Sequence, residues 1–143
     1  MLRLCGAPFC TGVSYYLDHE PLGRSDEARI WVRVGASAGT LRWLALVDTG
    51  APWCIVDGMI ADALRLTTHE DAGLETRFGL LRGELHRVPV MLFADEGEPL
   101  IIDATVFASA RWTGPNVIGY HGFLERLRFA VDPGARGFYF GKL

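Results

Sequence analysis

The residues best suited to chemistry are Asp48, Thr49 and Gly50, which directly follow the apolar run of residues 44–47 (Leu-Ala-Leu-Val). Such a run is typical of a buried β-strand, and this strand would deliver the Asp48 carboxylate into a turn at its end. A carboxylate held in this way is a candidate general acid or base. Asp, Gly and Pro are also the usual turn residues, so residues 48–52 are equally compatible with a turn that has no chemical role.

A second apolar motif lies further along the chain. Val117, Ile118 and Gly119 follow one another, and residues 122–127 after them are long enough for one or two helical turns. Ile118 lies 70 positions after Asp48, which leaves room for a long hairpin between the two motifs.

Two glycines bracket apolar and basic residues within that interval. The pattern is typical of a β-hairpin tip with a hinge at each end, and it is also compatible with an ordinary surface turn. The segment consists of Phe78, Gly79, Leu80, Leu81, Arg82 and Gly83. We expect Arg82 either to contact an acidic group of a substrate or simply to be solvated.

The surrounding sequence predicts the elements that position these residues. Residues 29–35 alternate as a half-buried strand does, small and turn-forming residues follow, and residues 41–47 return as the strand that ends on Asp48. Asp57 is placed to cap a short helix that ends near Leu66. Further strands are predicted over residues 85–93, 100–107, 128–131 and 137–140. Residues 1–28 show no clear period and are predicted to form an arm or loop.

Length and composition limit the class of protein. The chain has 143 residues, half of them apolar, and a net charge of −3, which fits a single globular domain. No basic face or run suggests a nucleic-acid or membrane-surface protein, and no apolar stretch is long enough to cross a bilayer. Gly6 and Pro8 interrupt the N-terminus before a signal-like apolar core. We expect a cytoplasmic protein.

The cysteines predict neither a disulfide framework nor a metal site. Three thiols, Cys5, Cys10 and Cys54, cannot all pair within one chain. The spacing of Cys5 and Cys10 is not that of a zinc knuckle, and His19 does not complete a ligand set. Cys54 follows Trp53 in an apolar run and is predicted to be a small core residue rather than a nucleophile.

The motifs together resemble those of retropepsin-type single-domain aspartic proteases. Residues 48–51, Asp-Thr-Gly-Ala after an apolar strand, and residues 117–119, two apolar residues and a glycine before a short helix, match the two signatures of that family in order. The resemblance covers roughly residues 29–141. It implies a mainly β fold, a closed β-barrel of the acid protease type with one or two short helices, in a domain of residues 29–143 after an arm of residues 1–28.

The resemblance also implies a catalytic mechanism and a partner. Two adjoining carboxyls that share a proton hydrolyse a peptide bond without a metal or another cofactor. This chain has one Asp-Thr-Gly, so a second copy of Asp48 across the twofold axis of a homodimer would complete the pair. The expected substrate is a peptide or protein.

Each motif residue takes a role from the resemblance. Asp48 would be catalytic, the Thr49 hydroxyl would link the two loops across the dyad, and Gly50 would let the backbone turn sharply. Ala51 completes the loop and residues 78–83 would be the flap over the substrate. Val117, Ile118 and Gly119 would pack beneath the loop.

Two features depart from the pattern of the family. The arm before residue 29 is longer than a compact retropepsin needs, and Pro52, Trp53 and Cys54 make the segment after the loop bulky. The role of the arm and the substrate preference are therefore open. An inactive peptide-binding or dimerisation module with the same fold remains an alternative function, as does an enzyme that processes a single partner.

The other acids and the nearest histidine have structural explanations. His121 is expected to start a helix, and Asp132 belongs to a turn. Asp103 interrupts a strand and is expected to face solvent. The remaining acids, which should cap helices or be solvated, are Asp57, Asp62, Glu70 and Asp71.

Overall fold

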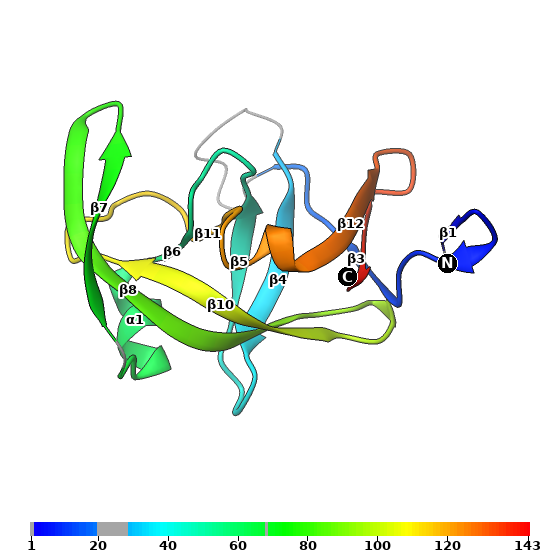
Figure 1. The fold of residues 1–143 in the computed structure, drawn as a ribbon, viewed down its shortest axis with the longest axis horizontal. Coiled ribbons are helices and arrows are strands. Elements are labelled where there is room, and N and C mark those ends of the chain that lie inside the picture. Colours follow the sequence, from blue (N-terminus) through cyan, green and yellow to red (C-terminus); the bar gives the residue numbers. More distant parts are fainter. Residues whose placement is uncertain (1, 20–28, 68) are drawn as a thin grey trace.

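The structure is a computed structural model that describes residues 2–19, 29–67 and 69–143. Within these residues the chain is mainly β, as predicted, with the α-helix α1 (Gly58–Leu64) and the 3-10 helix η1 (Leu124–Arg126). Figure 1 shows the β7–β8 hairpin at one end of the long axis and both chain termini toward the other. No helix of the described residues is long and apolar enough to cross a membrane.

A seven-stranded sheet forms the larger part of the molecule. Its strands, in spatial order, are β10 (Leu100–Ala108), β6 (Cys54–Val56), β11 (Val117–Ile118), β5 (Arg42–Val47), β4 (Trp31–Ala36), β8 (Gly79–Leu92) and β7 (Glu70–Thr76). β10 also pairs with β8 along its whole length, in antiparallel register from Leu100 opposite Leu92 to Ala108 opposite Glu84. β11 is parallel to β5 and antiparallel to β6, which brings the two sequence motifs together.

A four-stranded antiparallel sheet lies beside it. Its strands, in order, are β12 (Leu127–Asp132), β13 (Gly137–Lys142), β3 (Gly12–Tyr15) and β9 (Glu96–Gly97). The strands β1 (Arg3–Leu4) and β2 (Ala7–Pro8) form a separate N-terminal hairpin.

The prediction of an irregular arm over residues 1–28 missed β3, which pairs with β13 and β9. Gly12, Val13 and Ser14 are all buried, so the strand has no alternation of apolar and polar residues for a sequence pattern to detect. Residues 20–28 of the predicted arm lie outside the described residues.

Most other predicted elements are present, with shifted ends. The hairpin of β4 and β5 is confirmed, and the Asp57 carboxylate accepts the Ile60 amide at 2.9 Å as the predicted cap. The helix ends at Leu64, where Arg65 turns into the left-handed conformation. The strand predicted from residue 85 starts at Gly79, and the helix predicted over residues 122–127 is the single 3-10 turn η1.

Two apolar clusters fill the interior. The larger lies between the two sheets and α1 and includes the fully buried Phe123, Phe138 and Phe140. The smaller, here called the floor cluster, packs against the predicted catalytic loop. Its buried members are Trp31, Leu46, Ala51, Ile55, Leu74, Phe107 and Val117.

Candidate active site

Asp48 lies directly after β5, as predicted, and its carboxylate is held by its own loop. Oδ1 of Asp48 accepts a hydrogen bond from the Gly50 amide at 2.9 Å, and the Asp48 carbonyl accepts one from the Ala51 amide at 3.2 Å. Asp48 is half-buried, while Thr49 and Gly50 are exposed. The carboxylate is therefore oriented by the backbone, in a loop whose next two residues face outward.

The Val117–Ile118 segment fixes this loop from below. The Asp48 amide donates to the Ile118 carbonyl at 3.1 Å, and Val117 and Ile118 are both buried. After the strand, the amides of Tyr120 and His121 donate at 2.9 Å to the carbonyls of Ala51 and Pro52. These backbone bonds join the Asp48 loop to residues 116–121, here called the crossing segment, which lie far from it in the sequence. The loop therefore cannot shift without moving the crossing segment.

Gly119 is required by the closeness of that crossing. A Cβ at this position would lie 2.5 Å from the Trp53 carbonyl carbon and 2.8 Å from the Ala51 carbonyl oxygen, and closer still to the Trp53 oxygen. All three atoms belong to the backbone and cannot swing aside. Gly119 thus lets the two segments touch, which is a steric role rather than a conformational one.

Trp53 packs against the floor cluster. Its ring stacks on Phe107, with 5.9 Å between ring centroids and an interplanar angle of 19°. Phe107 is fully buried and Trp53 is partly buried. Trp53, the bulky residue that departs from the pattern of the family, is therefore part of the apolar packing beside the Asp48 loop.

The predicted flap segment belongs to the β7–β8 hairpin. The turn is at Arg77 and Phe78, where the Thr76 hydroxyl accepts the Phe78 amide at 3.1 Å and donates to the Gly79 carbonyl at 2.9 Å. Gly79 has a φ of +114°, which favours glycine. Figure 1 shows the tip of this hairpin at the far left of the view, at one end of the molecule.

The members of the flap segment have different surroundings. Phe78 and Leu80 are 92% and 57% exposed, whereas Leu81 is partly buried against the floor cluster. Arg82 is exposed, and its carbonyl accepts the Ser109 hydroxyl at 2.8 Å. At Gly83 an added Cβ would lie 2.5 Å from the Ala108 carbonyl oxygen, so this glycine allows β8 to approach β10.

Asp132 and Asp103 have the structural roles predicted for them. Asp132 accepts the Gly134 amide at 2.9 Å within its turn, and exposed Asp103 pairs with Arg87 at 2.6 Å. Glu125 accepts the Gly122 amide at 2.7 Å and lies 3.4 Å from the His121 ring. The Gly122 amide first, and then His121, hold the pKa of Glu125 below its ordinary value. η1 has Phe123 at its N-cap position and no side-chain cap, so the expected role of His121 in starting a helix is limited to its contact with Glu125.

Cys54 is a core residue, as predicted. It is buried in β6, and this burial raises the pKa of its thiol to about 12. A thiol of this kind stays protonated and is a poor nucleophile. Cys10 is also buried, whereas Cys5 is exposed in the turn of the N-terminal hairpin.

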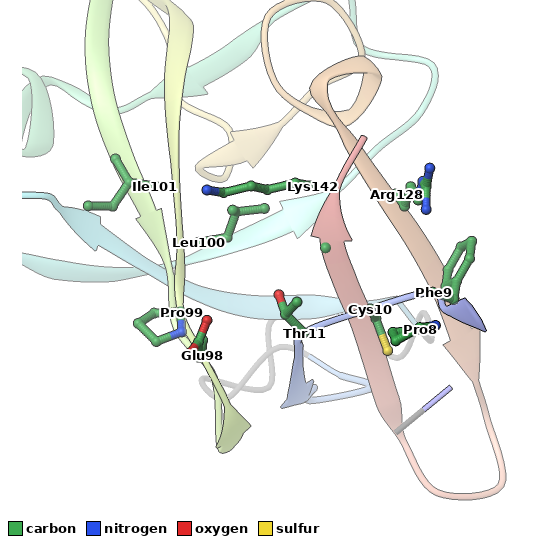
Figure 2. Close-up of a pocket in the computed structure, with 11 residues that line it drawn as sticks. Pro8, Phe9, Cys10, Thr11, Glu98, Pro99, Leu100, Ile101, Arg128 and Lys142 are labelled. Carbon is green, nitrogen blue, oxygen red and sulfur yellow. The ribbon is translucent and has the colours of Figure 1, made fainter. Parts of the chain in front are cut away.

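A separate pocket lies near the N-terminal segment and the start of β10. Figure 2 shows its two basic side chains, Lys142 and Arg128, pointing to different sides. Glu98 is the carboxylate in its lining, and the predicted site residues do not contribute to it. The pocket therefore offers no convergent acid and base.

Sequence reasoning missed two residues near the site. Asn116, just before β11, accepts the Asp57 amide at 2.8 Å and donates to the Asp57 carboxylate at 3.2 Å, which ties the crossing segment to the helix cap. Trp112 packs against the floor cluster and donates its indole N–H to the Pro115 carbonyl at 2.9 Å. The Gly114-Pro115 pair between these two residues is the sequence feature that could have indicated a turn here.

The chain matches no model of a known protein family, and no curated protein sequence is significantly similar to it.

Proposed function

We propose that this protein is an aspartic endopeptidase in which two copies of the chain each supply Asp48. The observation that carries the proposal is the backbone-held Asp48 carboxylate, with Oδ1 on the Gly50 amide and the Asp48 amide on the Ile118 carbonyl. Exposed Thr49 and half-buried Asp48 leave one side of the loop open to a second copy. One carboxylate alone cannot serve as base and acid at the same time.

The circuit of strand pairings supports a closed barrel of the acid protease type. Pairing runs from β10 through β6, β11, β5, β4 and β8, and returns from β8 to β10. In this circuit each of the six strands has a neighbour on both sides, which would hold the ends of β5 and β11 at fixed positions. The proposed barrel would therefore give the catalytic loop a rigid base.

The two carboxyls would divide the work of peptide hydrolysis. One Asp48 carboxylate removes a proton from a water molecule while that water attacks the scissile carbonyl carbon. The protonated Asp48 of the other copy donates its proton to the carbonyl oxygen. The tetrahedral intermediate, which now carries two hydroxyls, then collapses. The carboxyl that took the proton from water gives it to the leaving nitrogen, the other carboxylate takes a proton from one hydroxyl as the carbonyl re-forms, and the carbon–nitrogen bond breaks. The β7–β8 hairpin would cover the peptide and exclude bulk water.

Replacement of the carboxylate tests the proposal. Purified Asp48→Asn and the unchanged protein are incubated with an unfolded protein substrate from acidic to neutral pH. We expect the variant to lose at least about 100-fold in rate, because an amide neither accepts nor donates the catalytic proton. Asp62→Asn is the matched control, since Asp62 is an exposed carboxylate on α1.

A mixing experiment tests the shared site. Excess Asp48→Asn chains added to active protein should lower activity further than dilution does, because mixed dimers have one carboxylate. Equal cleavage by Asp48→Asn and the unchanged protein would contradict the proposal. Dimerisation with peptide binding but no cleavage in either protein would favour the inactive binding module instead.

A further inference from the structure

We propose a Zn²⁺ site at the base of the β7–β8 hairpin, held by His69, Asp71 and Glu84. Each of these three side chains offers one ligand atom, and the three atoms lie within 4.8 Å of one another. An imidazole with two carboxylates is a ligand set that suits Zn²⁺ better than Mg²⁺ or Ca²⁺, which prefer oxygen alone. The site is distinct from Asp48, and it depends on no step of the proposed hydrolysis.

The strand register places the ligands together. Asp71 of β7 lies directly opposite Glu84 of β8. His69 precedes Asp71 by two residues, so a strand-like backbone projects both side chains from the same face. Ligand atoms around a tetrahedral zinc ion lie about 3.3 Å apart, given bond lengths near 2.0–2.2 Å. All three residues are exposed, and rotation of their side chains can close the remaining gap.

The charges of two of the ligands also favour a cation here. Carboxylates directly opposite each other on paired strands repel and destabilise the pair. A divalent ion between Asp71 and Glu84 would replace this repulsion with two attractions. The protein therefore has an electrostatic reason to gain stability from a bound metal at this position.

A buried histidine lies beside one of the ligands. His86 is only 6% exposed, and its Nε2 atom lies 3.4 Å from Oε2 of Glu84. Groups that contact a metal ligand from behind orient it and strengthen binding. His69 and His86 also line one pocket, together with Thr105 of β10. His86 would thus position the Glu84 carboxylate toward the metal.

The position of the site determines what a bound metal would do to the β7–β8 hairpin. β8 pairs with β10 only from Glu84 onward, so residues 79–83 pair with β7 alone. Asp71 and Glu84 therefore lie where the hairpin leaves the body of the sheet. Two-stranded hairpins are marginally stable by themselves, so a metal link across the strands at this point would stiffen the base of the hairpin.

Titration of the full-length protein with ZnCl₂, followed by calorimetry, tests the site. We expect one ion per chain for the unchanged protein and no comparable binding of MgCl₂. His69→Ala, and separately Asp71→Asn with Glu84→Gln, should weaken Zn²⁺ binding by more than the roughly 10–100-fold that loss of an outer partner costs. His19→Ala is the matched control, because His19 is an exposed histidine with a carboxylate, Asp18, at 2.7 Å.

Amide hydrogen exchange distinguishes Zn²⁺ bound at this site from Zn²⁺ bound elsewhere on the protein. Zn²⁺ should slow exchange in residues 70–84 of the unchanged protein and of His19→Ala, but not of His69→Ala. Thermal unfolding of each metal-free variant confirms that it is folded. Absence of Zn²⁺ binding up to about 1 mM, or equal affinity in the unchanged protein and the ligand variants, would overturn the proposal.

Discussion

The Asp48 loop and the β7–β8 hairpin are held in opposite ways. Backbone hydrogen bonds to the Ile118 carbonyl and from the amides of Tyr120 and His121 hold the loop and the residues that follow it. In the outer part of the hairpin, residues 79–83 of β8 pair with β7 alone among the described residues, and Phe78 at the tip is 92% exposed. The loop is fixed by backbone hydrogen bonds from a distant segment, whereas the outer part of the hairpin is joined to the rest of the molecule mainly by the packing of Leu74 and Leu81 in the floor cluster.

The contrast fits what each region has to do in the proposed enzyme. Reacting groups lose rate when they are misplaced by about an ångström, so a catalytic carboxylate needs a backbone that cannot shift. A cover over the substrate has to open and close, and such elements come from the least stable parts of a fold. Stability and sensitivity to mutation should therefore differ sharply between the two regions.

The largest effect is expected at the crossing beneath the loop. Gly119→Ala puts a Cβ 2.5 Å from the Trp53 carbonyl carbon, and the backbone atoms around it cannot move independently. We expect a loss of about 3 kcal/mol or more in the free energy of unfolding, at or above the upper end for overpacking. Urea unfolding measures this loss of free energy.

Gly58→Ala is the control for that substitution. A Cβ at Gly58 meets no atom within 4 Å, and Gly58 begins α1, where alanine is the better helix former. Its stability should be unchanged or slightly raised. A Gly119→Ala protein as stable as Gly58→Ala would show that the crossing is looser than its geometry implies.

A smaller loss is expected where the crossing segment meets the helix cap. Asn116→Ala removes two hydrogen bonds to Asp57 and leaves the half-buried Asp57 amide without this acceptor. The expected cost is about 1–3 kcal/mol. Thr113→Ala, an exposed change in the same loop, should alter stability by less than about 0.5 kcal/mol. Similar unfolding midpoints for the two variants would show that the hydrogen bonds between Asn116 and Asp57 do not stabilise the protein.

Alkaline pH should destabilise the region behind the loop. Burial raises the pKa of Cys54 to about 12, whereas a thiol in the unfolded chain titrates near 8.5. The unfolded chain thus releases this proton first, so stability is complete below about pH 8.5 and falls as pH rises toward 12, by up to about 1.4 kcal/mol per pH unit.

Substitution of Cys54 isolates its contribution to the pH dependence of stability. Between pH 8 and pH 9.5 the unchanged protein should lose about 1 kcal/mol more than Cys54→Ala does. Cys5→Ala, which removes the exposed thiol, should keep the slope of the unchanged protein. Urea midpoints at the two pH values give the comparison, and identical slopes in all three proteins would mean that Cys54 is accessible to solvent.

The smallest effect on stability is expected at the hairpin tip. Phe78→Ser changes a side chain that is 92% exposed, so stability should move by less than about 0.5 kcal/mol. Cleavage of an unfolded protein should nevertheless slow, because the tip would lose apolar contact with the peptide. The same change at the fully buried Phe107 should be strongly destabilising. A large loss of stability at Phe78 would contradict the view of the tip as a free cover.

Local patterns were sufficient where chain neighbours determine the structure. The β4–β5 hairpin, the Asp57 cap and the position of Asp48 after β5 follow from alternation, capping chemistry and an apolar run that ends in a turn. β3 was missed because three consecutive residues of it are buried. The 3-10 form of η1 was missed because a predicted helix of one or two turns has too few residues to specify its hydrogen bonding.

The sequence by itself determined the mainly β character of the chain and the order of its two motifs, because strand periodicity and turn chemistry are local properties. Only the tertiary structure decided that Gly119 lies against the Trp53 carbonyl, that Asn116 binds Asp57, and that His69 gathers with Asp71 and Glu84. These contacts depend on strand register and on the crossing of distant segments. A shift of one residue in register turns every side chain to the other face, and no local pattern specifies it across such distances.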